Sequence, residues 1–188
     1  MKMHRRVAGA MLVALVAALP ILAAGGQAAD ATIEQRLRRV EDELAIRRVL
    51  VDYAATQDAH DFDAYVALFA RNGEWVNGST VHKGHAAIRK MLVDLYGAPP
   101  PGFVNNDSYH ITSNPQIEVN GDRATARSRH LLVMRGANGQ PTPALAGRYE
   151  DEFIREDGKW KILRRVDFPV MPTPEEWMKF IRERRAAQ

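Results

Sequence analysis

Residues 123–135 read RATARSRHLLVMR, and this stretch decides the fold class. Arginine or threonine alternates in it with small or apolar residues, which is the period-two pattern of a β-strand with one wet and one buried face. The charged positions must face water, so the other set must point into the interior. That inward set comprises Ala124, Ala126, Ser128, His130, Leu132 and Met134. Such a strand needs neighbouring strands and a layer that covers its buried face.

Three further stretches show strand-like patterns, at residues 108–119, 144–155 and 160–168. Hairpin turn signals separate them, namely Asn-Gly-Asp at 120–122 and Glu-Asp-Gly-Lys at 156–159. Together the four stretches predict an antiparallel meander. In the first of them Ser108, His110, Thr112 and Asn114 share one face, and periodicity alone leaves open whether that face is wet or lines a cavity.

The chain before residue 97 has mainly helical periodicity. Residues 31–57 predict one long helix, with Leu37, Val40, Leu44 and Val51 as its buried stripe. Asp61 is placed to cap a second helix that runs to about residue 69. Residues 74–76 begin an extended segment, and residues 85–96 predict a third helix. A short helix at 174–185 closes the chain. These elements predict an α+β domain in which three N-terminal helices pack on one face of a strongly bent antiparallel sheet, and we expect the sheet to enclose a pocket for an apolar small molecule.

The first 28 residues have the features of a secretory signal peptide. Lys2, Arg5 and Arg6 precede an apolar run, and small residues surround a cut site after Ala28. A retained membrane anchor is the alternative, because the run is nearly long enough to span a bilayer. We therefore expect residues 29–188 to form one mature domain, periplasmic or secreted, with no membrane contact after cleavage.

Charge and cysteine content exclude several classes of protein. The chain has 26 basic and 23 acidic residues, and the signal segment holds three of the basic ones, so the expected mature domain is formally neutral. The basic character of the full chain is therefore no argument for nucleic-acid binding. Because the chain has no cysteine, it has neither disulfides nor cysteine-ligated metals. No spacing of His, Asp and Glu predicts a metal site, and we expect no cofactor.

Four residues are candidates for chemistry: Tyr53, Asp58, His110 and His130. A histidine oriented by a carboxylate is a general base, and a phenol can stabilise a developing enolate oxygen. Each residue also has a structural interpretation. Asp58 could cap a helix, His110 could lie on the surface, and His130 and Tyr53 could be ordinary interior side chains. The remaining histidines of the mature chain, His60, His82 and His85, are interpreted as solvated.

Several segments resemble the SnoaL-like group of the nuclear transport factor 2-like superfamily. These are residues 40–50 (VEDELAIRRVL), Tyr53, residues 58–63 (DAHDFD) and Leu68-Phe69, supported by KGHAAI at 83–88, NGDRA at 120–124 and DGKWKI at 157–162. The resemblance covers nearly all of the mature chain and implies the cone fold. It is weaker evidence for a reaction, because this superfamily hosts many chemistries.

The resemblance also implies roles for the four candidates. Scytalone dehydratase, bile-acid 7α-dehydratase and hexachlorocyclohexane dehydrochlorinase pair an aspartate with a strand histidine, and these positions fall on Asp58 and His110. A tyrosine of the bile-acid enzyme falls on Tyr53, and a second histidine of scytalone dehydratase falls on His130. The implied function is a cofactor-independent lyase or isomerase, dehydratase-like, that acts on a cyclic apolar molecule.

Two other functions stay open at this point. A non-catalytic binding protein of the same fold would not need Asp58 to touch His110. An assembly subunit would show an exposed apolar patch on the strands from 144 to 168. Members of this superfamily commonly form dimers or trimers through the outer sheet face, so we expect a homo-oligomer.

Overall fold

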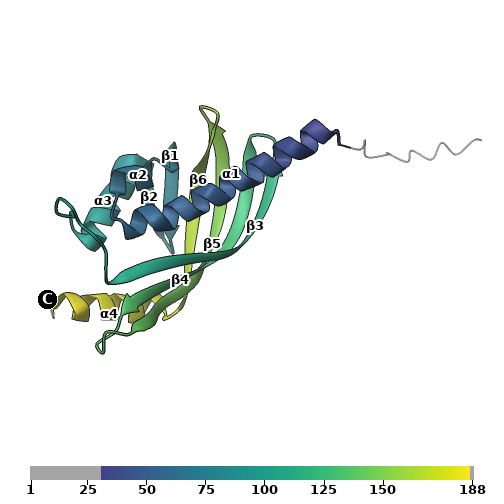
Figure 1. The fold of residues 1–188 in the computed structure, drawn as a ribbon. Helices are drawn as coiled ribbons and strands as arrows, with labels where there is room; N and C mark the ends of the chain where they lie inside the picture. The colour runs from purple at the N-terminus through teal and green to yellow at the C-terminus, as the bar shows by residue number, and fades with distance from the viewer. Residues whose placement is uncertain (1–30, 187–188) are drawn as a thin grey trace, which may run out of the picture. The chain divides into compact units, whose positions relative to one another are not determined.

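The computed structural model describes residues 31–186, so the predicted signal peptide at 1–28 lies outside the described residues. Residues from 32 onward form one unit. Figure 1 shows its helices lying against a curved sheet. The elements in chain order are α1 (Ile33–Asp58), α2 (Phe62–Val66), β1 (Phe69–Asn77), β2 (Thr80–Lys83), α3 (Gly84–Tyr96), β3 (Ser108–Asn120), β4 (Arg123–Arg135), β5 (Pro141–Glu156), β6 (Lys159–Met171) and α4 (Pro174–Ala186).

The sheet has six strands in the order β2-β1-β6-β5-β4-β3. Strands β3 to β6 are the predicted antiparallel meander, and β1 adds a parallel strand beside β6. The sheet is curved and does not close, and the helices pack on it, which confirms the α+β cone. The sequence pattern missed the edge strand β2, which has only four residues.

The inward faces of β3 and β4 decide where the site lies. On β4 the burial alternates as expected from Arg123 to His130, so that Ser128 and His130 are buried while Arg127 and Arg129 are exposed. On β3 a register shift between Ser113 and Gln116 changes the side that faces inward. Before the shift Ser108, His110 and Thr112 are the more buried positions, so this part of the polar face lines the interior. Asn114 is exposed, because the irregularity turns it outward.

Helix α1 packs on the sheet through a different face from the one predicted. The expected stripe of Leu37, Val40, Leu44 and Val51 is exposed, and that prediction was wrong. The buried positions are Asp42, Ile46, Leu50, Tyr53 and Ala54. Both sets have helical spacing, and the buried set includes a carboxylate, which a search for apolar periodicity passes over.

The carboxylate of Asp42 ties α1 to the sheet. Its Oδ1 accepts hydrogen bonds from Arg155 at 2.5 Å and from the Trp160 indole at 3.1 Å. Burial alone raises the pKa of Asp42, but the two hydrogen bonds and the charge of Arg155 outweigh burial and hold the pKa below its ordinary value. Arg155 also bonds Asp122 in the β3–β4 turn, so one side chain joins the helix to two strands.

The shorter helices are close to the predicted ones. Asp61 caps α2 through its Oδ1, which accepts from the Ala64 backbone amide at 3.0 Å, but α2 ends at Val66, and Phe69 already belongs to β1. In α3 Ile88 and Leu92 are buried, whereas Leu95 lies toward the surface. Among the described residues, no helix is long and apolar enough to cross a membrane.

Candidate active site

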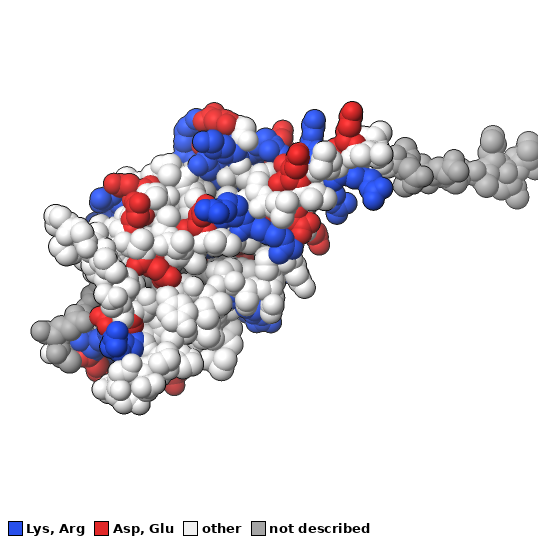
Figure 2. Space-filling model, viewed as in Figure 1, with Lys and Arg blue, Asp and Glu red and all other residues white. Residues whose placement is uncertain are grey.

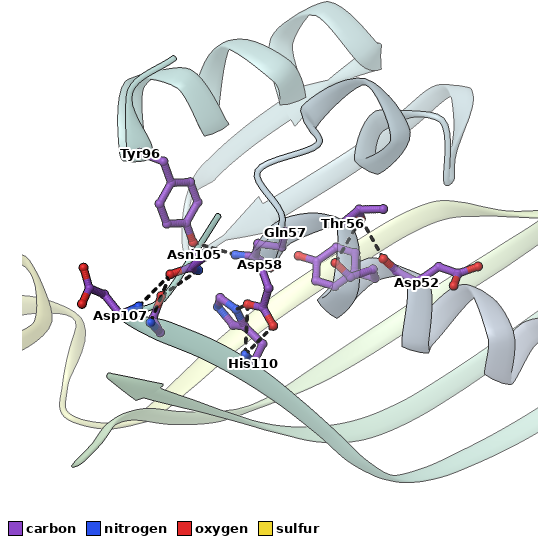
Figure 3. Close-up of polar contacts among 10 residues, drawn as sticks. Asp52, Thr56, Gln57, Asp58, Tyr96, Asn105, Asp107 and His110 are labelled. Carbon is purple, nitrogen blue, oxygen red and sulfur yellow. Dashed lines mark hydrogen bonds and ion pairs between the residues drawn. The ribbon is translucent and has the colours of Figure 1, made fainter. Parts of the chain in front are cut away.

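The end of α1 brings Asp58 against the start of β3, where His110 lies (Figure 3). Asp58 Oδ1 lies 2.6 Å from His110 Nδ1. The same carboxylate accepts from the His110 backbone amide, at 3.1 Å through Oδ1 and 3.0 Å through Oδ2. Both side chains are partly buried, with exposed fractions of 10% for His110 and 23% for Asp58. Asp58 therefore fixes both the strand and the imidazole ring.

These contacts define which ring nitrogen of His110 can act as a base. An ionised carboxylate can only accept hydrogen bonds, so the ring nitrogen that contacts Asp58 must be the donor. Nδ1 therefore carries the hydrogen that points at Asp58. Nε2 is then the nitrogen with the lone pair, and it makes no hydrogen bond among residues 31–186. This arrangement gives His110 a free acceptor and an oriented ring, which are the two requirements of a general base.

A cavity of about 530 Å³ is lined by neighbours of this pair, although neither Asp58 nor His110 is itself among its lining residues. Its wall includes Ser108, two residues before His110 on the same face of β3, and Leu132, which pairs with His110 across the strands. Helix α4 contributes Trp177, Ile181 and Arg184. The cavity thus reaches the immediate neighbours of the Asp58–His110 pair, and it is large enough for a small ring system.

Three rings form one side of the cavity. His60 is stacked on Phe103, with ring centroids 4.4 Å apart and planes at 13°, and it lies 4.8 Å from Tyr96. The prediction that His60 is solvated was wrong, because the turn after α1 folds it under these rings. Burial lowers the pKa of His60, the charge of Asp58 opposes that effect, and His110 adds to it. This face suits an uncharged, flat ligand surface.

Tyr96 gives the cavity a polar group. Its hydroxyl accepts a hydrogen bond from Gln57 Nε2 at 2.7 Å, and its own hydrogen remains available for donation (Figure 3). Gln57 precedes Asp58, and its Oε1 is buried without a partner among the described residues. Burial raises the pKa of Tyr96, so the hydroxyl stays protonated near neutral pH.

The loop before β3 is held by Asn105. Its Oδ1 accepts from the amides of Asp107 and Ser108 at 3.1 and 3.2 Å, and its Nδ2 donates to the Ser108 hydroxyl at 3.2 Å. Because Asn105, Asp107 and Ser108 all line the cavity, this local network fixes the wall that leads to His110.

Tyr53 is a core residue in this structure. Its hydroxyl accepts from the Trp75 indole at 3.0 Å, and its ring lies 3.8 Å from the Arg165 guanidinium carbon. Arg165 is itself fully buried and makes two hydrogen bonds with Asp151, at 2.7 and 2.8 Å. Tyr53 is only 2% exposed and makes no hydrogen bond with the Asp58–His110 pair, so the structure gives it a supporting position.

His130 belongs to a second, deeper histidine–carboxylate pair. Its Nε2 lies 3.0 Å from Asp167 Oδ1, and its ring stacks on Tyr149 with centroids 4.2 Å apart. Its Nδ1 is buried without a partner among the described residues. Gly147 makes room for the pair, because a Cβ there would lie 2.4 Å from His130 Nε2. His130 does not line the cavity beside His110.

His82 and His85, the other two histidines expected to be solvated, are both partly buried. The ring of His85 lies 3.0 Å from the Phe69 carbonyl oxygen and is partly buried, so it is not simply solvated. His82 is also partly buried, with its ring centroid 5.9 Å from that of Trp75. Within residues 31–186 no three His, Asp or Glu side chains gather closely enough to hold a metal ion.

Sequence reasoning missed His60, Tyr96, Phe103 and Gln57 as cavity residues or their partners. All four lie at a helix end or in a loop, where periodicity carries no information. The available signal was chemical: His60 follows Asp58 by two residues, and Gln57 precedes it by one. Polar and aromatic residues clustered around a candidate catalytic carboxylate are themselves candidates.

With this geometry in place, comparison with known proteins identifies the family. The SnoaL-like domain family matches residues 38–166, so the chain belongs to that family. This confirms the resemblance noted in the sequence. The match spans α1 through most of β6 and includes Asp58 and His110.

One curated protein and two solved structures illustrate what the chain is similar to. The uncharacterised protein Rv2910c of Mycobacterium tuberculosis is 26% identical over 131 residues, which are 68% of this chain and 85% of that protein. A nuclear transport factor 2-like protein with a cystatin-like fold from Novosphingobium aromaticivorans is 24% identical with a TM-score of 0.65, covering 80% of this chain and 96% of that one. A candidate scytalone dehydratase from the same organism is 28% identical with a TM-score of 0.60, covering 72% and 89%.

Proposed function

We propose that this protein is a cofactor-independent lyase or isomerase, of the dehydratase kind, that acts on an apolar cyclic molecule. The observation that carries the proposal is the Asp58–His110 hydrogen bond of 2.6 Å, with His110 Nε2 free of partners within residues 31–186. The similarity to a candidate scytalone dehydratase supports the same class of reaction.

In the proposed elimination, His110 Nε2 takes a proton from the carbon next to a substrate carbonyl. The electrons of that C–H bond form the new carbon–carbon double bond, and the β-hydroxyl group leaves with the proton that His110 returns to it, so the net change is loss of water. An isomerase would instead return the proton to another carbon. Asp58 holds the ring and stabilises the transient imidazolium, as a carboxylate does beside a catalytic histidine.

The substrate oxygen needs a donor where negative charge develops. Tyr96 fits that role better than Tyr53, because Tyr96 lines the cavity and Tyr53 is occupied by Trp75 and Arg165. We likewise propose that His130 supports the inner wall through Asp167 and does not assist the leaving group.

The experiment is a turnover screen with cyclic β-hydroxyketones. Turnover is measured as the rise in absorbance of the conjugated enone that elimination produces. His110→Ala should reduce turnover by at least ~100-fold while circular dichroism stays unchanged. His82→Ala on β2 is the matched control and should keep full activity. A fully active His110→Ala protein would contradict the mechanism.

The rival function is a carrier or sensor that binds the same kind of ligand without chemistry. The stacked rings of His60, Phe103 and Tyr96 favour it, since they provide affinity without a base. Ligand binding without turnover in the wild-type protein, unchanged by Asp58→Asn, would establish this alternative.

A further inference from the structure

The outer face of α1 carries apolar side chains that nothing in the described chain covers. Their exposed fractions are large: Ile33 81%, Leu37 56%, Val40 54%, Leu44 60% and Val51 59%. The spacing between the first four is four, three and four residues, and the fifth follows seven residues after Leu44. This is the a and d pattern of a coiled coil, so we call these five residues the α1 seam.

The N-terminal part of α1 buries no residue against the rest of the domain, although Arg39 lies at a groove beside β3, β4 and β5. Every residue from 33 to 41 is exposed, and burial begins only at Asp42. Figure 1 shows this end of the helix extending past the strands. These residues continue the 26-residue helix α1 and are capped by Thr32, so their helical form does not itself require a partner. Their exposed Ile, Leu and Val side chains do leave an apolar stripe in water, which favours a partner surface.

We infer that the α1 seam pairs with the α1 seam of a second copy of this chain, as a parallel two-stranded coiled coil. With Leu37 and Leu44 at a positions, Arg36 and Glu43 are g positions. In a parallel coiled coil each g residue faces the e residue five positions later on the partner. Arg36 then faces Glu41 of the other copy, and Glu43 faces Arg48. Both pairs are of opposite charge, and each occurs twice in a symmetric dimer.

The opposite helix orientation fits less well. An antiparallel pairing that sets Leu37 against Val40 of the other copy places Glu34 near Glu41 and Arg36 near Glu43. One repulsive and one attractive pair then each occur twice, whereas both pairs of the parallel arrangement are attractive. Charge also argues against a lipid surface as the occupant, because acidic and basic side chains alternate along this helix (Figure 2) instead of forming a basic face.

The rest of the fold leaves the seam free for this contact. Ile46 and Leu50 pack against the sheet, and on a helical projection they lie on the side of α1 opposite Leu37 and Leu44. Two domains joined at the seam would thus extend away from each other.

One position of the seam pattern is charged. Arg47 occupies a d position between Leu44 and Val51, and Glu43 on the same helix already pairs with it at 2.7 Å.

This surface differs from the outer sheet face expected from the sequence. The outward side chains of β5 and β6 include Arg148, Glu150, Glu152 and Arg164. These positions are charged, but Val166 and Phe168 lie on the same face, and Val170 and Met171 at the end of β6 are 47% and 64% exposed.

The test is sedimentation equilibrium of the full chain, as processed by the cell that expresses it. The wild-type protein should be a dimer, and Leu37→Glu/Leu44→Glu should raise the dissociation constant at least ~100-fold with unchanged circular dichroism. Val81→Glu introduces the same charge at an exposed apolar residue on β2 and should leave the dimer intact. Since the chain has no cysteine, Leu44→Cys should form one intermolecular disulfide under oxidation, whereas Val81→Cys should not.

Three results would overturn the inference. One is a monomeric wild-type protein, including one that instead binds anionic lipid vesicles. Another is a dimer that survives the double glutamate substitution, because the interface would then lie elsewhere. A dimer in which Leu44→Cys fails to cross-link would exclude the parallel pairing.

Discussion

Asp58 contributes three hydrogen bonds to one neighbour, two to the His110 backbone amide and one to its ring. A carboxylate used only as a helix cap would bond the amides of its own helix. The hydrogen bonds from β3 to Asp58 therefore indicate that this carboxylate orients the His110 ring.

Asp58→Asn should retain the fold and lose most of the activity, by about 100- to 10,000-fold. The amide can donate through its nitrogen to the ring, which favours hydrogen on Nε2 and removes the base. Steady-state kinetics on any substrate found by the screen measures this. Asp52→Asn, at the surface of the same helix, is the control and should be unaffected; equal losses in both variants would point to a helix defect.

The stacked rings of His60, Phe103 and Tyr96 lead to a prediction about the pH dependence of ligand binding. Because burial lowers the pKa of His60 from its ordinary 6.5, the ring is uncharged at neutral pH and acquires charge only in more acidic solution. Binding of a neutral apolar probe such as Nile red should weaken between pH 7.5 and pH 5. His60→Phe should bind more evenly over that range, because it keeps the stack and cannot be protonated; His82→Phe should behave as wild type.

At this scale the sequence indicated Asp58 and His110 but left their roles open. Spacing could show that one follows a helix and the other lies on a strand. It could not show Tyr96, His60 and Phe103 converging beside them, because that depends on the loop from 97 to 107, whose path follows from local hydrogen bonds such as those of Asn105. Tyr53 was placed in the site because its tertiary partners, Trp75 and Arg165, were invisible in one dimension.

Among the elements, α1 shows how a periodic pattern can mislead. It has two candidate faces, one fully apolar and one that contains Asp42, and the second packs on the sheet. The buried face combines Ile46, Leu50 and Tyr53 with the pairing of Asp42 to Arg155, which lies more than one hundred residues away. The meander strands were predictable because alternation and hairpin turns are local, whereas the parallel β1–β6 pairing is not.

Asp42→Ala should destabilise the fold by about 1–3 kcal/mol at pH 7, because Arg155 and Trp160 lose their acceptor. The folded-state pKa of Asp42 is lowered, so its contribution is complete above the ordinary value of 3.8 and is lost as the pH falls through the lower folded value. Urea unfolding at pH 7 and near pH 2.5 should therefore show a difference between wild type and variant that shrinks at low pH. A constant difference would assign the effect to packing alone.

For the whole molecule, the fold class and the family followed from the sequence because the patterns extend over most of the chain. A cysteine-free domain of this length can be stable through its core alone. We also propose that the chain is exported and cut after Ala28. N-terminal sequencing of the exported protein should begin at Ala29, and an intact N-terminus would support the membrane-anchor alternative.

The central claim is that Asp58 holds His110 with its hydrogen on Nδ1 and its Nε2 free to accept a proton. Nitrogen-15 NMR of the imidazole rings tests this without a known substrate, and the His110 signals can be assigned by their loss in His110→Gln. The structure predicts that the neutral His110 ring carries its hydrogen on Nδ1 and none on Nε2, with the pattern lost in Asp58→Asn. A proton on Nε2 and none on Nδ1 in the wild-type protein would contradict the account.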